Sequence, residues 1–378
     1  MDQLFVNLKN MALHLIGVFA PDWLVSLSSI LISVGAMTFL GIFIMMYLTL
    51  MERKVIGRMQ NRIGPNRVGK WGLLQPVADA IKMLTKEDIV PEPADRLLHF
   101  LAPVMIVIPA LLIFAVIPFG RNMTALDLNV GLLYFFAMSS TTTMVIFMAG
   151  WGSRNKYASL GGMRSVAQMI SYEVPMVLSV VPVLLSVGSL STGKIVEAQA
   201  DLWFVLTPWG FFACVIFFLC GVAECNRSPF DLPEAESEIV AGFHTEFSGM
   251  KFALFYMAEF MNAFSIAALT ATLFLGGWQG PLLPSWLWFI LKTYSLLFVM
   301  MWFRGTLPRL RADQMMGLAW KFLLPLALVN ILAAGLHLYL GGPAGFASAL
   351  IILLGSFMGL SKVNRSYVPE KREYVLAD

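Results

Sequence analysis

Long apolar runs separated by short polar segments repeat along the whole chain. Nine of these runs approach or exceed the length of about 20 residues that a helix needs to cross the hydrocarbon of a bilayer. They cover residues 24–50, 99–119, 129–150, 166–190, 207–223, 249–277, 285–303, 319–340 and 343–361. Only GGPA separates the last two runs, so eight spans are the alternative. The pattern predicts an all-α, polytopic membrane helix bundle that forms a single integral membrane domain over residues 1–378.

Two segments outside these runs have a different, amphipathic pattern. Between Leu73 and Lys86 the apolar residues fall on one helical face, while Gln75, Asp79 and Lys82 lie on the other. This pattern predicts a helix that lies along the membrane surface with its apolar face down, and a helix that packs on the end of the bundle is the alternative. The first 23 residues have an apolar run broken by charge and no small-residue cleavage site, which favours an amphipathic lead-in over a signal peptide.

The composition agrees with a membrane protein and the basic residues give its orientation. Hydrophobic residues make up 58% of the chain and charged residues only 13%, against roughly a quarter in soluble domains. If the first span runs from outside to inside, 22 of the 26 Lys and Arg residues lie on the cytoplasmic side. The N-terminus is then outside and the C-terminus inside. The cytoplasmic segments are 51–98, 151–165, 224–251, 304–321 and a tail at 362–378.

Most kinds of cofactor or catalytic site are not supported by the sequence. Cys214, Cys220 and Cys225 are too few for an iron–sulfur cluster and are better explained as small buried residues. GPNRVGK at 64–70 fits the first seven positions of a phosphate-binding loop, but Trp71 occupies the position of the required hydroxyl. No catalytic triad or metal motif is found. The net charge of +3 follows from the membrane topology and gives no reason to expect a nucleic-acid partner.

Ionisable residues within the apolar runs are the strongest functional signal, because they are costly at membrane depth. Glu173, Glu259, Lys292 and His337 belong to this group. Glu173 lies in SYEVP, where Pro175 leaves a backbone carbonyl free one turn away. Lys292 is a candidate counter-ion for Glu259. The alternative is that these side chains only hold helices together.

An acid-rich stretch, NRSPFDLPEAESE at 226–238, falls in the one cytoplasmic segment where acidic residues outnumber basic ones. Asp231 is placed to cap a short helix in which Glu234 and Glu238 share a face. Like charges four residues apart repel each other, and such a pair can hold a shared proton. A solvated acidic face is the alternative.

Several long motifs identify a family. They are MERKVIGRMQNRIGPNRVGKWGLLQPVADAIKMLTKED, SYEVP, NRSPFDLPEAESEIVAGFHTEFSGMKFALFYMAEF and RGTLPRLRADQMMGLAWK. The chain strongly resembles the H subunit of bacterial NADH:quinone oxidoreductase, respiratory complex I, whose mitochondrial counterpart is subunit 1. The resemblance extends from about residue 24 to 340 and is dense in every cytoplasmic segment.

This resemblance implies a subunit that binds no redox cofactor, with FMN and iron–sulfur clusters in partner subunits. It implies part of a quinone chamber with Arg53, Arg62, Gln75 and Asp79 along it, and no catalytic residue or metal ligand of its own. An acidic proton path is implied at Glu173, Glu224, Glu234, Glu236, Glu238, Glu246 and Glu259.

The expected partners are the hydrophilic quinone-site subunits, small membrane subunits of the pumping arm, membrane lipid and quinone. The expected location is the bacterial cytoplasmic (inner) membrane. Two other functions remain open at this point. One is the related membrane subunit of an energy-converting hydrogenase, which uses no quinone. The other is an ion-coupled transporter, although the chain lacks the two related halves expected of one.

Overall fold

The computed structural model describes residues 4–17, 21–232 and 239–365, and every regular element within these ranges is helical. The long helices are α2 (Asp22–Met59), α4 (Arg96–Ile113), α5 (Gly131–Gly152), α6 (Lys156–Val187), α8 (Pro208–Glu224), α10 (Gly249–Phe274), α11 (Ser285–Thr306), α13 (Leu324–Leu340) and α14 (Gly342–Arg365). Shorter helices are α1 (Leu4–Gly17), α3 (Gln75–Thr85), α7 (Thr192–Glu197) and α12 (Ala312–Gly317).

All nine apolar runs form helices. Within the described ranges, eight helices are long and apolar enough to cross a membrane, and these include both α13 and α14. The remaining run, 207–223, forms α8, whose 17 residues are at the lower end of the range of about 17 to 25 that spanning helices need. Gly341, with a φ of +61°, lies in the GGPA segment and makes the sharp turn that separates α13 from α14.

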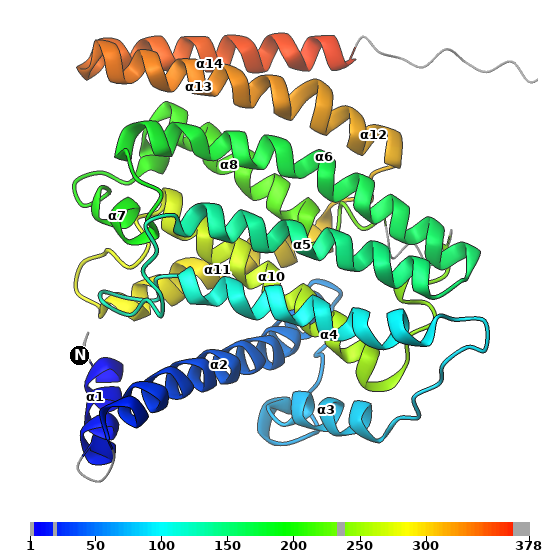
Figure 1. The fold of residues 1–378 in the computed structure, drawn as a ribbon. Coiled ribbons are helices and arrows are strands. Elements are labelled where there is room, and N and C mark those ends of the chain that lie inside the picture. The colour runs from blue at the N-terminus through cyan, green and yellow to red at the C-terminus, as the bar shows by residue number, and fades with distance from the viewer. Residues whose placement is uncertain (1–3, 18–20, 233–238, 366–378) are drawn as a thin grey trace, which may run out of the picture.

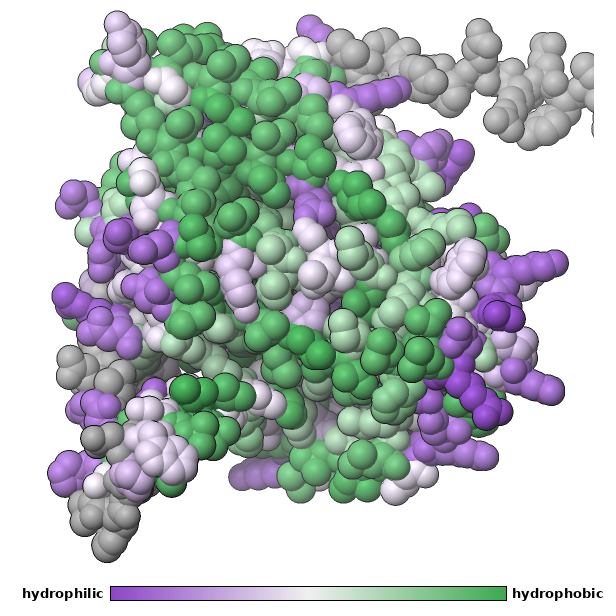
Figure 2. Space-filling model, in the orientation of Figure 1, coloured by the Kyte–Doolittle hydropathy of each residue, from purple (hydrophilic) through white to green (hydrophobic). Residues whose placement is uncertain are grey.

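The helices form one bundle with a polar surface at each end. In Figure 1 the long helices lie side by side, with α13 and α14 along one edge and α2 along the opposite edge. Figure 2 shows apolar side chains over the middle of the molecule and hydrophilic ones gathered towards the two ends. This distribution is the one expected of a bundle whose middle faces lipid.

Helix α10 is at the centre of the bundle. Its second half, from Ala263 to Phe274, is buried at every position. Aromatic side chains dominate the surrounding core, and Phe114 stacks on Phe264 with a distance of 5.7 Å between the ring centroids. A helix in the centre of a bundle can carry a charged residue in its less buried first half, because neighbouring helices can supply partners for that charge.

Two helices are longer than the apolar runs that predict them. Helix α2 continues nine residues past residue 50, so Glu52 and Arg53 lie on a helix rather than in a loop. Helix α6 begins at Lys156 instead of 166, where the Asn155 side chain accepts a hydrogen bond from the Tyr157 amide at the helix N-terminus. Hydropathy detects where a helix leaves the bilayer, whereas a helix ends only where capping or a breaker ends it.

Candidate functional site

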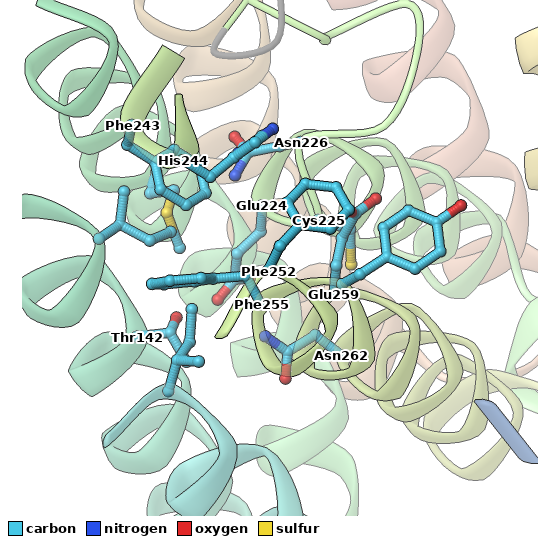
Figure 3. A pocket seen from close by; sticks show the side chains of 14 residues that line it. Thr142, Glu224, Cys225, Asn226, Phe243, His244, Phe252, Phe255, Glu259 and Asn262 are labelled. Atoms are coloured by element: carbon cyan, nitrogen blue, oxygen red, sulfur yellow. The ribbon is translucent and has the colours of Figure 1, made fainter. Parts of the chain in front are cut away.

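A small cavity lies among α4, α5, α6, α8 and α10. Its volume is about 40 Å³, and the polar side chains in its largely apolar lining include Glu224, His244, Glu259, Asn226 and Asn262. Figure 3 shows these side chains around the pocket with three phenylalanine rings between them. A cavity of this size has room for water, since one molecule needs roughly 10 to 15 Å³ by this measure, and these polar groups can bind it.

The cavity brings together carboxylates from different helices. Glu224 is the last residue of α8, and one of its oxygens accepts a hydrogen bond from the Ser139 hydroxyl of α5. Its other oxygen, Oε2, is buried and has no hydrogen-bond partner among the described residues. Glu173 of α6 accepts a hydrogen bond from Ser140, the next residue of α5. Two consecutive serines therefore connect carboxylates from two helices.

Charges of alternating sign extend from the cavity towards α2. Glu259 of α10 pairs with Arg227 at 2.7 Å, and Arg227 also pairs with Glu52 of α2 at 2.7 Å. Glu52 pairs in turn with Arg304 of α11. The Arg227 guanidinium lies 4.1 Å from the centroid of the Phe260 ring. We call Glu259, Arg227, Glu52 and Arg304 the charge row.

The local backbone explains how Arg227 reaches both carboxylates. After α8 ends, Asn226 adopts a φ of +52°, the left-handed conformation that asparagine tolerates at helix C-termini. The Arg227 amide then donates to the Val222 carbonyl at 3.2 Å, and the Asn226 amide donates to the Ala223 carbonyl at 3.1 Å. These are the two hydrogen bonds of a Schellman motif. The motif turns the chain back against the end of α8, where the Arg227 side chain is only 9% exposed.

Two neighbouring carboxylates keep the Arg227 guanidinium protonated. Burial alone would lower the pKa of its guanidinium, but the carboxylates of Glu259 and Glu52 raise that pKa above its ordinary value. Glu52 is also deeply buried, with 6% of its side chain exposed. The centre of the charge row, Arg227 and Glu52, is therefore desolvated, and every member of the row has an opposite charge beside it.

Three of the four residues predicted for the quinone chamber lie together where α3 meets α2. Arg53 pairs with Asp79 at 2.5 Å, and Gln75 donates to the other oxygen of Asp79 at 3.1 Å. Burial acts to raise the pKa of Asp79, but the hydrogen bond and charge of Arg53 outweigh it and lower that pKa. The fourth residue, Arg62, donates instead to the side chain of Gln60, two residues before it.

Glu246 is held by contacts with two neighbouring segments. Its carboxylate accepts a hydrogen bond from the Asn155 side-chain amide at 2.5 Å, and its backbone carbonyl is 3.3 Å from Nε2 of His99. His244, two residues earlier, lines the cavity itself, and burial lowers its pKa to about 4. Glu234, Glu236 and Glu238 lie outside the described residues.

The prediction that Lys292 is the counter-ion of Glu259 is wrong. The Lys292 ammonium donates to the carbonyls of Leu275, Gly277 and Gln279, at 2.5, 3.1 and 2.6 Å. It also lies 4.1 Å from the centroid of the Trp203 ring. The end of α10 and the loop after it thus satisfy Lys292 with backbone oxygens, whereas Glu259, near the start of α10, meets Arg227.

The prediction that the cysteines are small buried side chains is confirmed for Cys220 and Cys225, whereas Cys214 is half-buried. Sequence reasoning missed the importance of Glu52, Arg304, Ser139 and Ser140. A single acid in the last turns of a spanning helix is a usable signal for Glu52. The run SSTTT at 139–143 inside an apolar stretch is a comparable signal for the two serines.

Comparison with known proteins gives consistent matches over most of the chain. The NADH dehydrogenase family profile matches residues 32–335. The chain is similar to the H subunit of an NADH-quinone oxidoreductase from Dehalococcoides mccartyi, with 51% identity over 310 residues that cover 82% of this chain and 87% of the relative. It is also similar to the H subunit of the enzyme from Anoxybacillus flavithermus, with 54% identity over 77% of this chain and 88% of the relative.

Proposed function

The chain belongs to the family of NADH-quinone oxidoreductase H subunits, and from this premise we propose that it forms one wall of the quinone chamber and carries the carboxylate path that couples quinone reduction to proton translocation. As a membrane subunit of this enzyme complex, the chain has other subunits of the complex as its partners. The observation that carries the proposal is the shared cavity, which brings Glu224 and Glu259 together from two helices.

The proposed path begins where the charge row meets the cavity. Reduction of a quinone to a quinol consumes two electrons and two protons, and the electrons originate from NADH. We expect FMN and iron–sulfur clusters in partner subunits to deliver them. When the quinone takes up protons, the charge nearby changes, and protons shift among Glu259, Glu224 and Glu173 in response. Water in the cavity and the hydroxyls of Ser139 and Ser140 supply hydrogen bonds between these carboxylates.

Carboxylates suit this task because they exchange protons without large movement. Glu224 Oε2 has no partner among the described residues and lies buried beside the cavity, so it can accept a proton from cavity water. Glu259 forms an ion pair with Arg227, so a change in charge elsewhere in the charge row changes the electrostatic potential at the Glu259 carboxylate. Glu234, Glu236, Glu238 and Glu246 extend the proposed path on the cytoplasmic side.

The quinone end of the proposal rests on α2 and α3. Helix α3 has an exposed apolar face. It is formed by Val77, Ile81 and Leu84 together with Leu74 just before the helix, and Leu84 is 66% exposed. On the inner side of the helix, Asp79 faces Arg53 of α2. A helix with an apolar outer face and a polar inner face is suited to lie at the membrane surface where a lipid-like quinone leaves the bilayer. Arg53, Gln75 and Asp79, together with Arg62, then line the entrance.

We also propose the orientation that the basic residues predict. The ends of the helices near the cavity face the cytoplasm, with the N-terminus outside and the C-terminus inside, in the bacterial inner membrane. The acidic segment 224–248 and the loop 51–98 then lie on the side where the hydrophilic subunits bind.

The test is a comparison of Glu224→Gln and Glu259→Gln in the whole complex reconstituted into vesicles. Both changes preserve shape and remove a proton site, so we expect assembled complex with lower quinone reductase rate and lower proton uptake. Glu197→Gln changes an exposed carboxylate at the opposite end of the bundle and is the matched control. Rates and proton uptake equal to those of the control in both variants would overturn the proposal.

A further inference from the structure

One face of α6 contacts the segment that follows α8 at four successive positions. Gly161, Ser165, Gln168 and Tyr172 are spaced by four, three and four residues, which places them on one side of a helix. All four are buried. They contact Ala223 in the last turn of α8, Asn226 and Phe230 at the start of the acid-rich stretch, and Gly242 after it.

Gln168 makes the strongest of these contacts. Its side chain is fully buried, and Nε2 donates to the carbonyls of Ala223 and Phe230, each at 2.7 Å. The first carbonyl directly precedes Glu224 in the chain, and the second follows Arg227 by three residues. One amide group therefore fixes both ends of the turn that carries a cavity carboxylate and the central arginine of the charge row.

The other three positions hold the same segment. The Tyr172 ring lies 5.3 Å from the Phe230 ring, and the Ser165 hydroxyl is 3.5 Å from Oδ1 of Asn226. A Cβ on Gly161 would lie 2.5 Å from the Cα of Gly242, so only glycine permits this approach of the two backbones. The α6 face thus positions the segment on both sides of Glu224 and Arg227.

We propose that Gln168 is a positioning residue for proton coupling. It fixes the positions of Glu224 and Arg227 relative to each other, and therefore the distance between the cavity and the charge row. This inference rests on the proposed function of the two groups. The amide is needed because Ala223 and Phe230 present two buried carbonyls, and a buried carbonyl that loses its donor costs free energy. Without Gln168 the turn can relax, and Glu224 then moves relative to Arg227.

The test uses a second glutamine of the same kind as its control. Gln199 is also fully buried, and its Nε2 donates to the carbonyls of Ile195 and Thr272, but it lies at the opposite end of the bundle. Gln168→Met and Gln199→Met each remove a buried amide that bonds two carbonyls while nearly preserving volume. Purified complex carrying each change is assayed for NADH oxidation by quinone and by an artificial acceptor, and for protons moved per NADH in vesicles.

In Gln168→Met we expect quinone reductase activity to fall about tenfold while the artificial-acceptor activity is retained, because small misplacements of a reacting group cost large factors in rate. Protons moved per NADH should also fall. Gln199→Met should leave the quinone reductase activity and the number of protons moved per NADH near those of the unsubstituted complex. Equal effects of the two changes would overturn the inference, because loss of a buried amide would then explain both.

A second variant keeps the inference testable if Gln168→Met does not assemble. Gln168→Glu has nearly the same shape but donates a hydrogen bond only when protonated, so quinone reductase activity should rise as the pH falls, relative to the unsubstituted complex. An unchanged pH profile would overturn the inference. If Glu224→Gln and Glu259→Gln are also both without effect, the proposed function itself is wrong; if either of them slows the reaction, only the role of Gln168 is wrong.

Discussion

Replacement of Arg227 by methionine is the most direct test of the charge row. The change removes the one cation that lies between Glu52 and Glu259, which it meets at 2.7 Å each. Methionine retains much of the apolar stem and the contact with Phe260. Glu52 keeps a second partner in Arg304, whereas Glu259 loses its closest cation.

The size of the effect follows from burial. The side chains of Arg227 and Glu259 are 9% and 22% exposed, so water cannot replace the lost partner at full strength. Loss of one partner from a buried ion pair costs about 3 to 5 kcal/mol. By contrast, Arg311 and Asp313 form an ion pair with 78% and 65% exposure, which places it among surface pairs worth at most about 1 kcal/mol.

The assay is thermal inactivation of the purified complex, with retention of this chain measured at each temperature. For Arg227→Met we expect the midpoint to fall by about 5 to 10 °C, taking a few degrees per kcal/mol for a chain of this size. Arg311→Met is the matched control and should shift the midpoint little. The double variant Arg227→Met/Glu259→Gln removes the unpaired charge and should recover part of the loss.

Two results would refute this reasoning. A midpoint for Arg227→Met as high as that for Arg311→Met would mean that the buried pairs contribute no net stability. Equal midpoints for Arg227→Met and the double variant would mean that the unpaired carboxylate of Glu259 is not the source of the cost.

Three further predictions concern other parts of the chain. Asp79→Asn leaves Arg53 without its carboxylate, so quinone reduction should slow while NADH oxidation by an artificial acceptor continues; a parallel fall of both activities would contradict a role at the entrance. Burial lowers the pKa of His244 from 6.5 to about 4, so its neutral ring contributes stability that is fully present above pH 6.5 and declines as the pH falls towards 4. In His244→Gln the inactivation midpoint should lose this acid sensitivity, and an unchanged difference between pH 7 and pH 5 would contradict it. Lys292→Met removes the donor to three carbonyls of residues 275–279, so proteolysis of that loop should become faster with quinone reduction retained.

The sequence predicted the bundle because its signal is repeated and strong. Eight of the apolar runs are long enough to specify a spanning helix by themselves, and the amphipathic pattern at 73–86 predicted α3 within one or two residues at each end. Glu173 and Glu259 stand out in the sequence because an acid inside an apolar run is rare, and their role in a proton path stays a prediction. Predicting the helices needed no knowledge of which helices are neighbours.

Pairing between helices was much harder to predict. Lys292 was chosen as the partner of Glu259 because both lie in apolar runs, but Lys292 meets the carbonyls of residues 275–279 after the end of α10, whereas Glu259 lies in the first half of that helix. Arg227 follows a left-handed Asn226, and hydropathy contains no information about such a turn. Glu52 was placed in the cytoplasmic segment 51–98 because the first apolar run ends at residue 50. In each case the contact joins residues that are far apart in the sequence and become neighbours only in the folded chain.

The attachment of α2 gives the charge row a mechanical role. None of the described side chains from residues 23 to 40 is buried, whereas Gly41, Ile44, Leu48 and Glu52 are. In Figure 1 the first half of α2 leans away from the bundle towards α1. The helix is therefore anchored along its second half and has few neighbours in the bundle along its first half. Two arginines hold Glu52 within the anchored half, so we expect the charge row to help set the direction in which the first half of α2 leaves the bundle.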